Sequence, residues 1–344
     1  MDRAMKAAIL LMDNCFGTGI NGILDALIAA NYSLIKSGAM PLFEWELVSL
    51  DGNRVTPTNG LRIEADCDLA SFIARPEQPD IWIIPGIYQS ASNFEKVQTA
   101  MRQSEVMVPV LQRHVVDNKM IVCMCTGAFL LAQADLLGKN PALMHWRNEH
   151  HFRRAFPHLT IDSQNTIAEY GNLLCSIGGS MAYEYLVLRL VERFAGHQTA
   201  INTAKLLMMD LNAPPAAPYR AHQYQPEHQD ALVQQAQLYL QRNSSQDISM
   251  VEVAQELNIS DRQLKRRFAA ALDCSPLQYL QRLRVNQACS LLEATQLPSN
   301  KIVLEVGYQD ESSFRRLFKK QMAMTMESYR QQFGIQHQQH MAVG

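Results

Sequence analysis

The sequence of 344 residues predicts two folds in tandem, an α/β domain with a doubly wound parallel sheet and then an all-α domain. Two observations predict this order. Short apolar runs alternate with helical stretches in the first part of the chain, whereas a helix-turn-helix pattern occurs twice near its end. A proline-rich segment separates the two parts. The predicted domains are therefore residues 1–211 and 228–335, with a linker over 212–227 and a disordered polar tail over 336–344.

Apolar runs of strand length predict the sheet. The runs are residues 7–12, 45–50, 81–84 and 120–124. Because helical stretches connect them, they predict parallel strands in a flavodoxin-like, doubly wound arrangement. Ligand sites in such sheets lie beyond the carboxyl ends of the strands, so residues that directly follow these runs are candidates for a site.

Cys125 is one such residue. It follows the run 120–124 directly and precedes the helix that Thr126 and Gly127 open. A sharp strand-to-helix turn exposes a nucleophile, and the N-terminus of a helix favours the thiolate form of cysteine. The alternative is a plain buried thiol.

Several segments around Cys125 carry a family resemblance. They are Pro85-Gly86, Cys125-Thr-Gly-Ala-Phe-Leu-Leu-Ala132, Gly138, His145-Trp146 and Phe156-Pro157. Together they resemble the class I glutamine amidotransferase-like superfamily, which includes the PfpI-like proteins, and in particular its GlxA-like branch, which is fused to a DNA-binding domain.

The resemblance implies a site for a small molecule. In catalytic members the cysteine works with a histidine and with an acidic residue that follows the first strand. Cys125 and His145 match the first two, but residues 14–24 contain no Asp or Glu. A thiol without its partners is weakly activated, so we expect a vestigial elbow in a non-catalytic domain that needs no cofactor. The implied ligand-binding residues are Gly86, Ile87, Cys125, Thr126, Gly127, His145 and Trp146.

Two further motifs suggest other kinds of site. Gly17, Gly19 and Gly22 form a G-x-G-x-x-G pattern, but its first glycine lies too far beyond the first strand for a dinucleotide site. A glycine-rich loop that enters a helix is the interpretation we favour. The cluster from His145 to His151 misses the H-x-x-E-H spacing by one residue, so we expect no metal there.

The C-terminal domain is predicted to contain two helix-turn-helix units. In the first, a short helix over 250–257 is followed by Ser260, a good N-cap for a second helix whose Leu264 and Phe268 face inward. The same layout recurs over 302–320. Two matched units make an accidental match or a merely solvated charged face a poor explanation.

One helix that begins after Ser275-Pro276 is expected to join the units. Arg284 interrupts its apolar stripe and is expected to pair with a carboxylate. The predicted buried stripe is Leu277, Leu280, Ala288 and Leu291.

These motifs resemble the AraC/XylS family of transcription regulators. The matching segments are Ser275-Pro276-Leu277, Tyr279-Leu280, Arg284, Ala288, Leu291-Leu292, Gly307-Tyr308, Asp310, Ser312, Phe314 and Tyr329-Arg330. The pattern departs at two helix ends, where Asp273 and Ala323 replace the usual glycines. The resemblance implies that the second helix of each unit enters the DNA major groove. The residues expected to contact DNA are Arg262, Gln263, Lys265, Arg266, Ser312, Ser313, Arg315, Arg316 and Lys319.

Composition agrees with a cytoplasmic regulator. The formal net charge of −2 hides the local basic clusters that a DNA-binding surface needs. Seven cysteines, an odd number without framework spacing, favour free thiols in a reducing compartment, and the first apolar run is too short for a signal peptide or a membrane span. The expected partners are double-stranded DNA, a small effector such as an amino acid or a quaternary amine, RNA polymerase, and a second copy of the chain.

Two other classes of protein remain open. One is a Cys125–His145 hydrolase or amidase with a DNA-binding tail. The other is a nucleoid-associated protein that binds DNA without an effector. The sequence does not identify the effector or the operator, and it does not distinguish an activator from a repressor.

Overall fold

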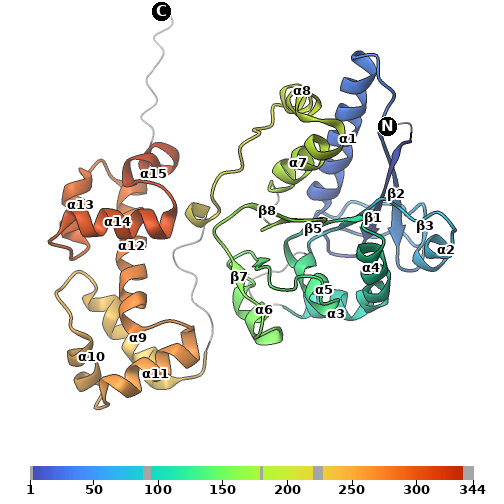
Figure 1. Cartoon of the computed structure of the whole chain (residues 1–344). Helices are drawn as coiled ribbons and strands as arrows, with labels where there is room; N and C mark the ends of the chain where they lie inside the picture. The colour runs from blue at the N-terminus through green and yellow to red at the C-terminus, as the bar shows by residue number, and fades with distance from the viewer. Residues whose placement is uncertain (1–2, 88–93, 179–180, 220–227, 336–344) are drawn as a thin grey trace, which may run out of the picture. The chain divides into compact units, whose positions relative to one another are not determined.

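A computed structural model of the chain describes residues 3–87, 94–178, 181–219 and 228–335. It divides into two compact units, Met1–Ala216 and Ala217–Gly344 (Figure 1). The boundary falls within the predicted linker. Residues 220–227 of that linker and the predicted tail, 336–344, lie outside the described residues.

The N-terminal unit is built on a seven-stranded sheet with the order β3-β2-β1-β4-β5-β9-β8. All its strand pairs are parallel except β8–β9, which is antiparallel. The predicted doubly wound α/β fold is confirmed, and the edge strand β8 is reversed, which was not predicted. The strands are β1 (Met5–Leu11), β2 (Phe43–Ser49), β3 (Cys67–Asp68), β4 (Ile81–Ile84), β5 (Met120–Met124), β8 (Ile167–Tyr170) and β9 (Leu173–Ser176).

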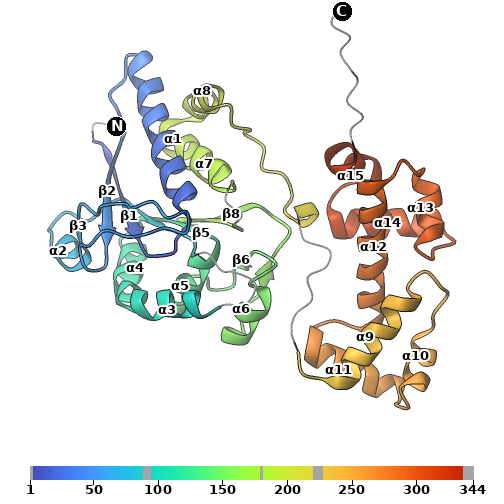
Figure 2. The same ribbon diagram turned by 180° about the vertical axis from the view of Figure 1, so that it is seen from behind.

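Helices cover both faces of this sheet (Figures 1 and 2). One face carries α1 (Gly17–Lys36), α7 (Tyr183–Ala195) and α8 (His197–Leu207), which pack on one another. The central strands are apolar without interruption because they are buried on both faces; every residue of β4 and β5 is buried. The opposite face and the edges carry α2 (Leu69–Ile73), α3 (Glu95–Gln103), α4 (Met107–Val116), α5 (Ala128–Gln133), α6 (Glu149–Ala155) and the small sheet of β6 (Ala142–Leu143) and β7 (Ile161–Asp162).

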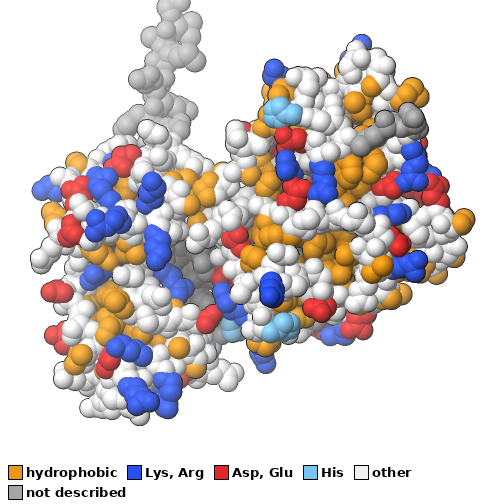
Figure 3. Space-filling model, in the orientation of Figure 1, with side chains coloured by type: hydrophobic (Ala, Val, Ile, Leu, Met, Phe, Trp, Pro, Cys, Tyr) orange, Lys and Arg blue, Asp and Glu red, His pale blue; other side chains and the backbone are white. Residues whose placement is uncertain are grey.

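The C-terminal unit is all helical, with α12 between two clusters of helices (Figures 1 and 2). Its helices are α9 (Ala231–Asn243), α10 (Met250–Glu256), α11 (Asp261–Leu272), α12 (Pro276–Ala294), α13 (Ser299–Glu305), α14 (Glu311–Met322) and α15 (Met326–Phe333). In the visible face of this unit, Lys and Arg side chains gather over both clusters (Figure 3). In the described ranges of the whole chain, no helix combines the length and apolarity needed to cross a bilayer.

Each helix cluster has its own hydrophobic core. Leu264 and Phe268 of α11 are buried in the first core, and Phe314 and Phe318 of α14 are buried in the second, as predicted. Leu277 corrects the predicted stripe of α12, because 51% of it is exposed. The helix turns from the first core to the second along its length, so a single straight stripe does not describe it.

Helix caps in this unit depend on short-range hydrogen bonds. The Ser260 hydroxyl accepts from the Gln263 N–H at 3.2 Å, which confirms the predicted N-cap. Asp273 and Ala323, where the family pattern has glycine, both adopt the left-handed conformation, with φ of 54° and 56°. The departures therefore keep the local geometry and make it strained, because a Cβ disfavours this conformation by about 1–2 kcal/mol.

Ala323→Gly is expected to raise the free energy of unfolding by about 0.5–1 kcal/mol, because glycine adopts φ near 56° without steric cost. Ala270→Gly, at an exposed position inside α11, is the control and should lower it by a similar amount. Urea unfolding of both variants measures the difference. Equal destabilisation by the two glycines would contradict the strain at Ala323.

Candidate functional site

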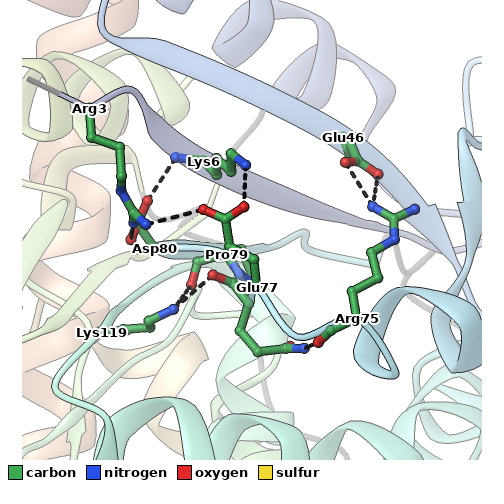
Figure 4. A network of polar contacts seen from close by, with 9 residues as sticks. Arg3, Lys6, Glu46, Arg75, Glu77, Pro79, Asp80 and Lys119 are labelled. Carbon is green, nitrogen blue, oxygen red and sulfur yellow. Dashed lines mark hydrogen bonds and ion pairs between the residues drawn. The ribbon is translucent and has the colours of Figure 1, made fainter.

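The two edges of the parallel sheet differ in chemistry. At the amino ends, ion pairs and hydrogen bonds connect Lys6 on β1, Asp80 before β4 and Lys119 before β5 with their surroundings (Figure 4). For example, the Lys6 N–H donates to Asp80 at 3.0 Å. These groups are partly exposed, and ion pairs in contact with water contribute about 0–1 kcal/mol each. The site candidate, Cys125, lies at the opposite, carboxyl edge.

Cys125 occupies a strained strand-to-helix turn. It follows β5 directly and starts the short 3-10 turn η2 (Cys125–Gly127), which leads into α5. Its φ is 51°, the left-handed region that a side chain disfavours. The turn is the backbone geometry of a nucleophile elbow.

Two glycines enclose the Cys125 side chain. A Cβ on Gly178, which has φ of 101°, would lie 2.4 Å from the Cys125 Sγ, and one on Gly86 would lie 2.8 Å from the Cys125 Cβ. Both approaches are closer than any side chain permits. Cys125 is only 6% exposed as a result.

A small cavity of about 20 Å³ lies beside Cys125. This volume is close to that of a single water molecule. Among the described residues, the lining contains no carboxylate and no imidazole. The lining residues are Phe16, Gly19, Gly86, Met124, Cys125, Ser176, Gly178 and Tyr183.

Of the predicted ligand residues, only Gly86 and Cys125 line this cavity. Thr126 and Ile87 bind one another instead. The Ile87 N–H donates to the Thr126 hydroxyl at 2.6 Å, and that hydroxyl donates to the Ile87 carbonyl at 3.1 Å. Gly127 lies against Cys123, where a Cβ would come within 3.0 Å of the thiol sulfur. These three residues support the wall of the site.

His145 and Trp146 follow β6 and are not among the lining residues of the cavity. The His145 Nδ1 accepts a hydrogen bond from the Arg147 N–H at 3.4 Å, and the His145 and Trp146 rings lie 5.0 Å apart. In the described part of the chain, no three His, Cys, Asp or Glu side chains gather as a metal site.

The other six lining residues were not among the predicted ligand-binding residues. Ser176 and Gly178 come from β9 and its end, and the four-residue run Leu173–Ser176 was not recognised as a strand. Gly19 and Tyr183 come from the glycine-rich start of α1 and from α7. A Cβ on Gly22 would lie 2.2 Å from the Tyr183 ring, so these glycines serve close packing between helices. The boundaries of β9, Gly171 and Gly178, were the signal available in the sequence.

The expected DNA-contacting residues lie on α11 and α14. In these two helices the side chains of Arg262, Arg266, Ser312 and Lys319 are exposed. Among the described residues, the two arginines and Lys319 have no ion-pair partner in the structure. They are available to phosphates or base edges without breaking an existing bond.

Other expected DNA contacts already have partners within the unit. The Gln263 carboxamide closes a capping box by accepting from the Ser260 N–H at 3.1 Å. Lys265 pairs with Asp261 at 2.6 Å. The cap occupies the Gln263 Oε1, so a base contact by Gln263 with the cap intact would use its Nε2 as donor.

On α14, Arg315 pairs with Glu311 at 2.8 Å and with Glu327 at 2.5 Å. These pairs connect α14 to α15. Arg316 is held toward Ser313, whose hydroxyl accepts from the guanidinium at 3.0 Å. Ser313 in turn donates to Asp310, the N-cap of α14. This arrangement orients Arg316 before any DNA is bound.

The geometry defines a class of protein: two helix-turn-helix units that expose basic helices, fused to an α/β domain with a nucleophile elbow. A helix-turn-helix domain model matches residues 253–332, and the DJ-1/PfpI family model matches residues 17–187. The chain is a transcriptional regulator that joins a DJ-1/PfpI domain to an AraC-type helix-turn-helix domain.

The relatives agree with this composition. The chain is 24% identical over 333 residues to the HTH-type transcriptional regulator GbdR of Pseudomonas aeruginosa, covering 94% of this chain and 83% of the relative. It is 25% identical over 214 residues to GlxA of Rhizobium meliloti, covering 61% and 64%, which confirms the GlxA-like resemblance. A solved structure of a candidate transcriptional regulator from Vibrio parahaemolyticus has a TM-score of 0.50 at 21% identity and covers 60% of this chain and 100% of that one. The last similarity concerns the fold alone.

Arg266→Ala and Arg316→Ala are each expected to weaken binding by about 1–3 kcal/mol at one base position of an operator selected from random DNA. Arg242→Ala is the control, because Arg242 is exposed near the end of α9 and lies outside α11 and α14. Affinities for single-base operator variants at constant salt measure the effect. A loss of equal size on every sequence, with a shallower salt slope, would make Arg266 or Arg316 a phosphate contact instead.

Proposed function

We propose that a small metabolite bound beside Cys125 controls how this regulator presents its two recognition helices to DNA. The observation that carries the proposal is the cavity at the carboxyl edge of the sheet, where ligand sites of such folds lie. The family resemblance favours an amino acid, a quaternary amine or a related nitrogen compound as the effector.

The size of the cavity determines how an effector could act. About 20 Å³ holds a single water molecule and is far too small for an amino acid. Binding therefore requires a more open arrangement of the lining, and the effector shifts the chain toward it. Such a shift can alter DNA binding only if the effector has unequal affinity for the closed and open forms.

The site is better suited to binding than to turnover. The thiol of Cys125 is packed between Gly86 and Gly178, which leaves little room for a substrate at the sulfur, and residues 14–24 lack the acidic residue of catalytic members. The names of the relatives are those of regulators. We therefore favour a non-catalytic sensor domain over a Cys–His hydrolase.

A chain of hydrogen bonds leads from the cavity wall to the start of the predicted linker. Ile177, next to Gly178, donates its N–H to the Thr166 carbonyl at 2.9 Å. The Thr166 hydroxyl donates to the Pro214 carbonyl. Two residues later the Ala216 N–H donates to the Gln164 carbonyl at 2.7 Å. A displacement of Gly178 on effector binding would reach the linker through these bonds.

The proposal includes partners that the resemblance implies. The chain acts in the cytoplasm as a homodimer on double-stranded operator DNA, and it contacts RNA polymerase there. Size-exclusion chromatography with light scattering and footprinting with polymerase would examine these points separately from effector binding.

A thermal-shift screen of the full chain against nitrogen metabolites tests the sensor. A ligand at 100 times its dissociation constant should add about 2.7 kcal/mol to the stability of the domain that binds it. Gly19→Leu should abolish the shift, because Gly19 lines the cavity and leucine would fill it. Asn21→Leu is the control, since it adds the same side chain at an exposed position of α1. A shift that persists unchanged in Gly19→Leu would place the ligand elsewhere, and a screen without hits would remove the support for effector control.

Thr166→Val tests the connection to the linker. The variant loses the hydroxyl that donates to Pro214 and keeps the shape of the side chain. We expect an unchanged thermal shift with effector but a smaller effect of effector on operator affinity. Ser163→Ala, in the same turn, is the control. Operator affinity is measured by fluorescence anisotropy with and without effector. If effector changes this affinity in Thr166→Val as much as in the wild-type chain, the hydrogen bonds through Thr166 do not transmit the signal.

A further inference from the structure

The two helix clusters of the C-terminal unit touch each other directly, apart from their shared helix α12. Gly307 lies in the turn between α13 and α14, and Ser245 lies just after α9. A Cβ on Gly307 would come within 2.6 Å of the Ser245 carbonyl oxygen, and Gly307 has φ of 82°. Only glycine permits both this backbone conformation and this approach.

Arg284, near the middle of α12, completes the contact. Its Nε donates to the Ser244 carbonyl at 2.7 Å, and its Nη2 donates to the Gln246 carbonyl at 2.7 Å. Its guanidinium lies 5.1 Å from the centre of the Tyr308 ring, in the turn of the other unit. The expected carboxylate partner is thus corrected: backbone carbonyls of one unit and an aromatic ring of the other surround Arg284.

The chemistry of arginine explains why it occupies this position. Its planar, forked guanidinium binds two acceptors at once and stacks on an aromatic ring, which lysine does not reproduce. The carbonyls of Ser244 and Gln246 follow the C-terminal end of α9, where the helix dipole attracts a cation. A further bond, from the Gln287 Nε2 to the Ser244 hydroxyl at 2.6 Å, fixes the same segment to α12.

We infer that this contact between Ser244–Gln246 and Gly307–Tyr308, held by Arg284, sets the spacing between two boxes, the DNA segments that α11 and α14 recognise. It would do so without touching DNA, as a positioning device for α11 and α14. The segment Ser244–Gln246 follows α9, on which α11 packs, and Gly307–Tyr308 leads into α14. Any displacement at the contact is therefore passed to both recognition helices.

The magnitude of the effect supports this inference. Arg284 lies eight residues after the start of α12 and ten residues before its end, and ten residues correspond to about 15 Å of helix. A bend of about 10° at that point would move the end of the helix by roughly 2.6 Å, close to the 3.4 Å rise of one base pair. Two boxes in successive major grooves must keep a fixed separation. An α12 without this support would let the distance between α11 and α14 vary.

The inference rests on DNA binding as given under the proposed function, and not on the effector. The experiment uses the full chain without effector. Binding sites are selected from random DNA, and affinity is then measured for the selected site and for versions with one base pair added or removed between the boxes. The wild-type chain should lose tenfold or more in affinity on either change. Arg284→Lys and Tyr308→Leu should reduce that penalty below threefold while each box alone is bound as before.

Arg242→Ala is the charge-matched control, because Arg242 is exposed near the end of α9 and outside the contact. It should keep the full spacing penalty. Gly307→Ala provides an independent variant if Arg284→Lys unfolds, as judged by thermal melting. A full penalty in folded Arg284→Lys and Gly307→Ala would overturn the inference and leave DNA binding intact. A wild-type chain that selects no sequence would instead refute sequence-specific DNA binding, and the inference with it.

Discussion

Close approach of one backbone segment to another is the constraint on which both units depend. In the N-terminal unit, Gly178 and Gly86 let two strand ends close on Cys125, and Gly22 lets α1 meet Tyr183 of α7. In the C-terminal unit, Gly307 lets the second turn reach the backbone at Ser245. Protein interiors are packed densely enough that one added methyl group is felt at such points. The candidate pocket and the arrangement of the recognition helices are thus products of the same packing principle.

Local patterns predicted the parts of the fold whose causes are local. The runs behind β4 and β5 were predicted with their bounds, and the Ser260 cap followed from the residues next to it. The short strand β9 was missed because three apolar residues and a serine do not by themselves distinguish a strand from a loop. The Gln263 side chain could have been read as part of a capping box, since Ser260 and Gln263 have the S-x-x-Q spacing.

Features formed by distant segments were not predicted. Three of the eight lining residues, Ser176 of β9, Gly178 and Tyr183, meet Cys125 only after the sheet is assembled. Likewise Arg284 was expected to need a carboxylate, because a half-buried cation suggests an anion. Its partners are carbonyls near the end of α9, about 40 residues away in the chain. The periodicity of apolar residues does not predict such partners.

The packing of Cys125 also makes the thiol an indicator of motion. Its sulfur is walled by the position of Gly178, so a reagent can reach it only while that wall is displaced. When opening and closing are fast, the rate of modification is proportional to the population of the open form, as in hydrogen exchange. The other cysteines of this unit with buried side chains, Cys15, Cys123 and Cys175, lie on other parts of the same fold. The rate of Cys125 modification would therefore report how often the cavity wall at Gly178 opens in the absence of any ligand.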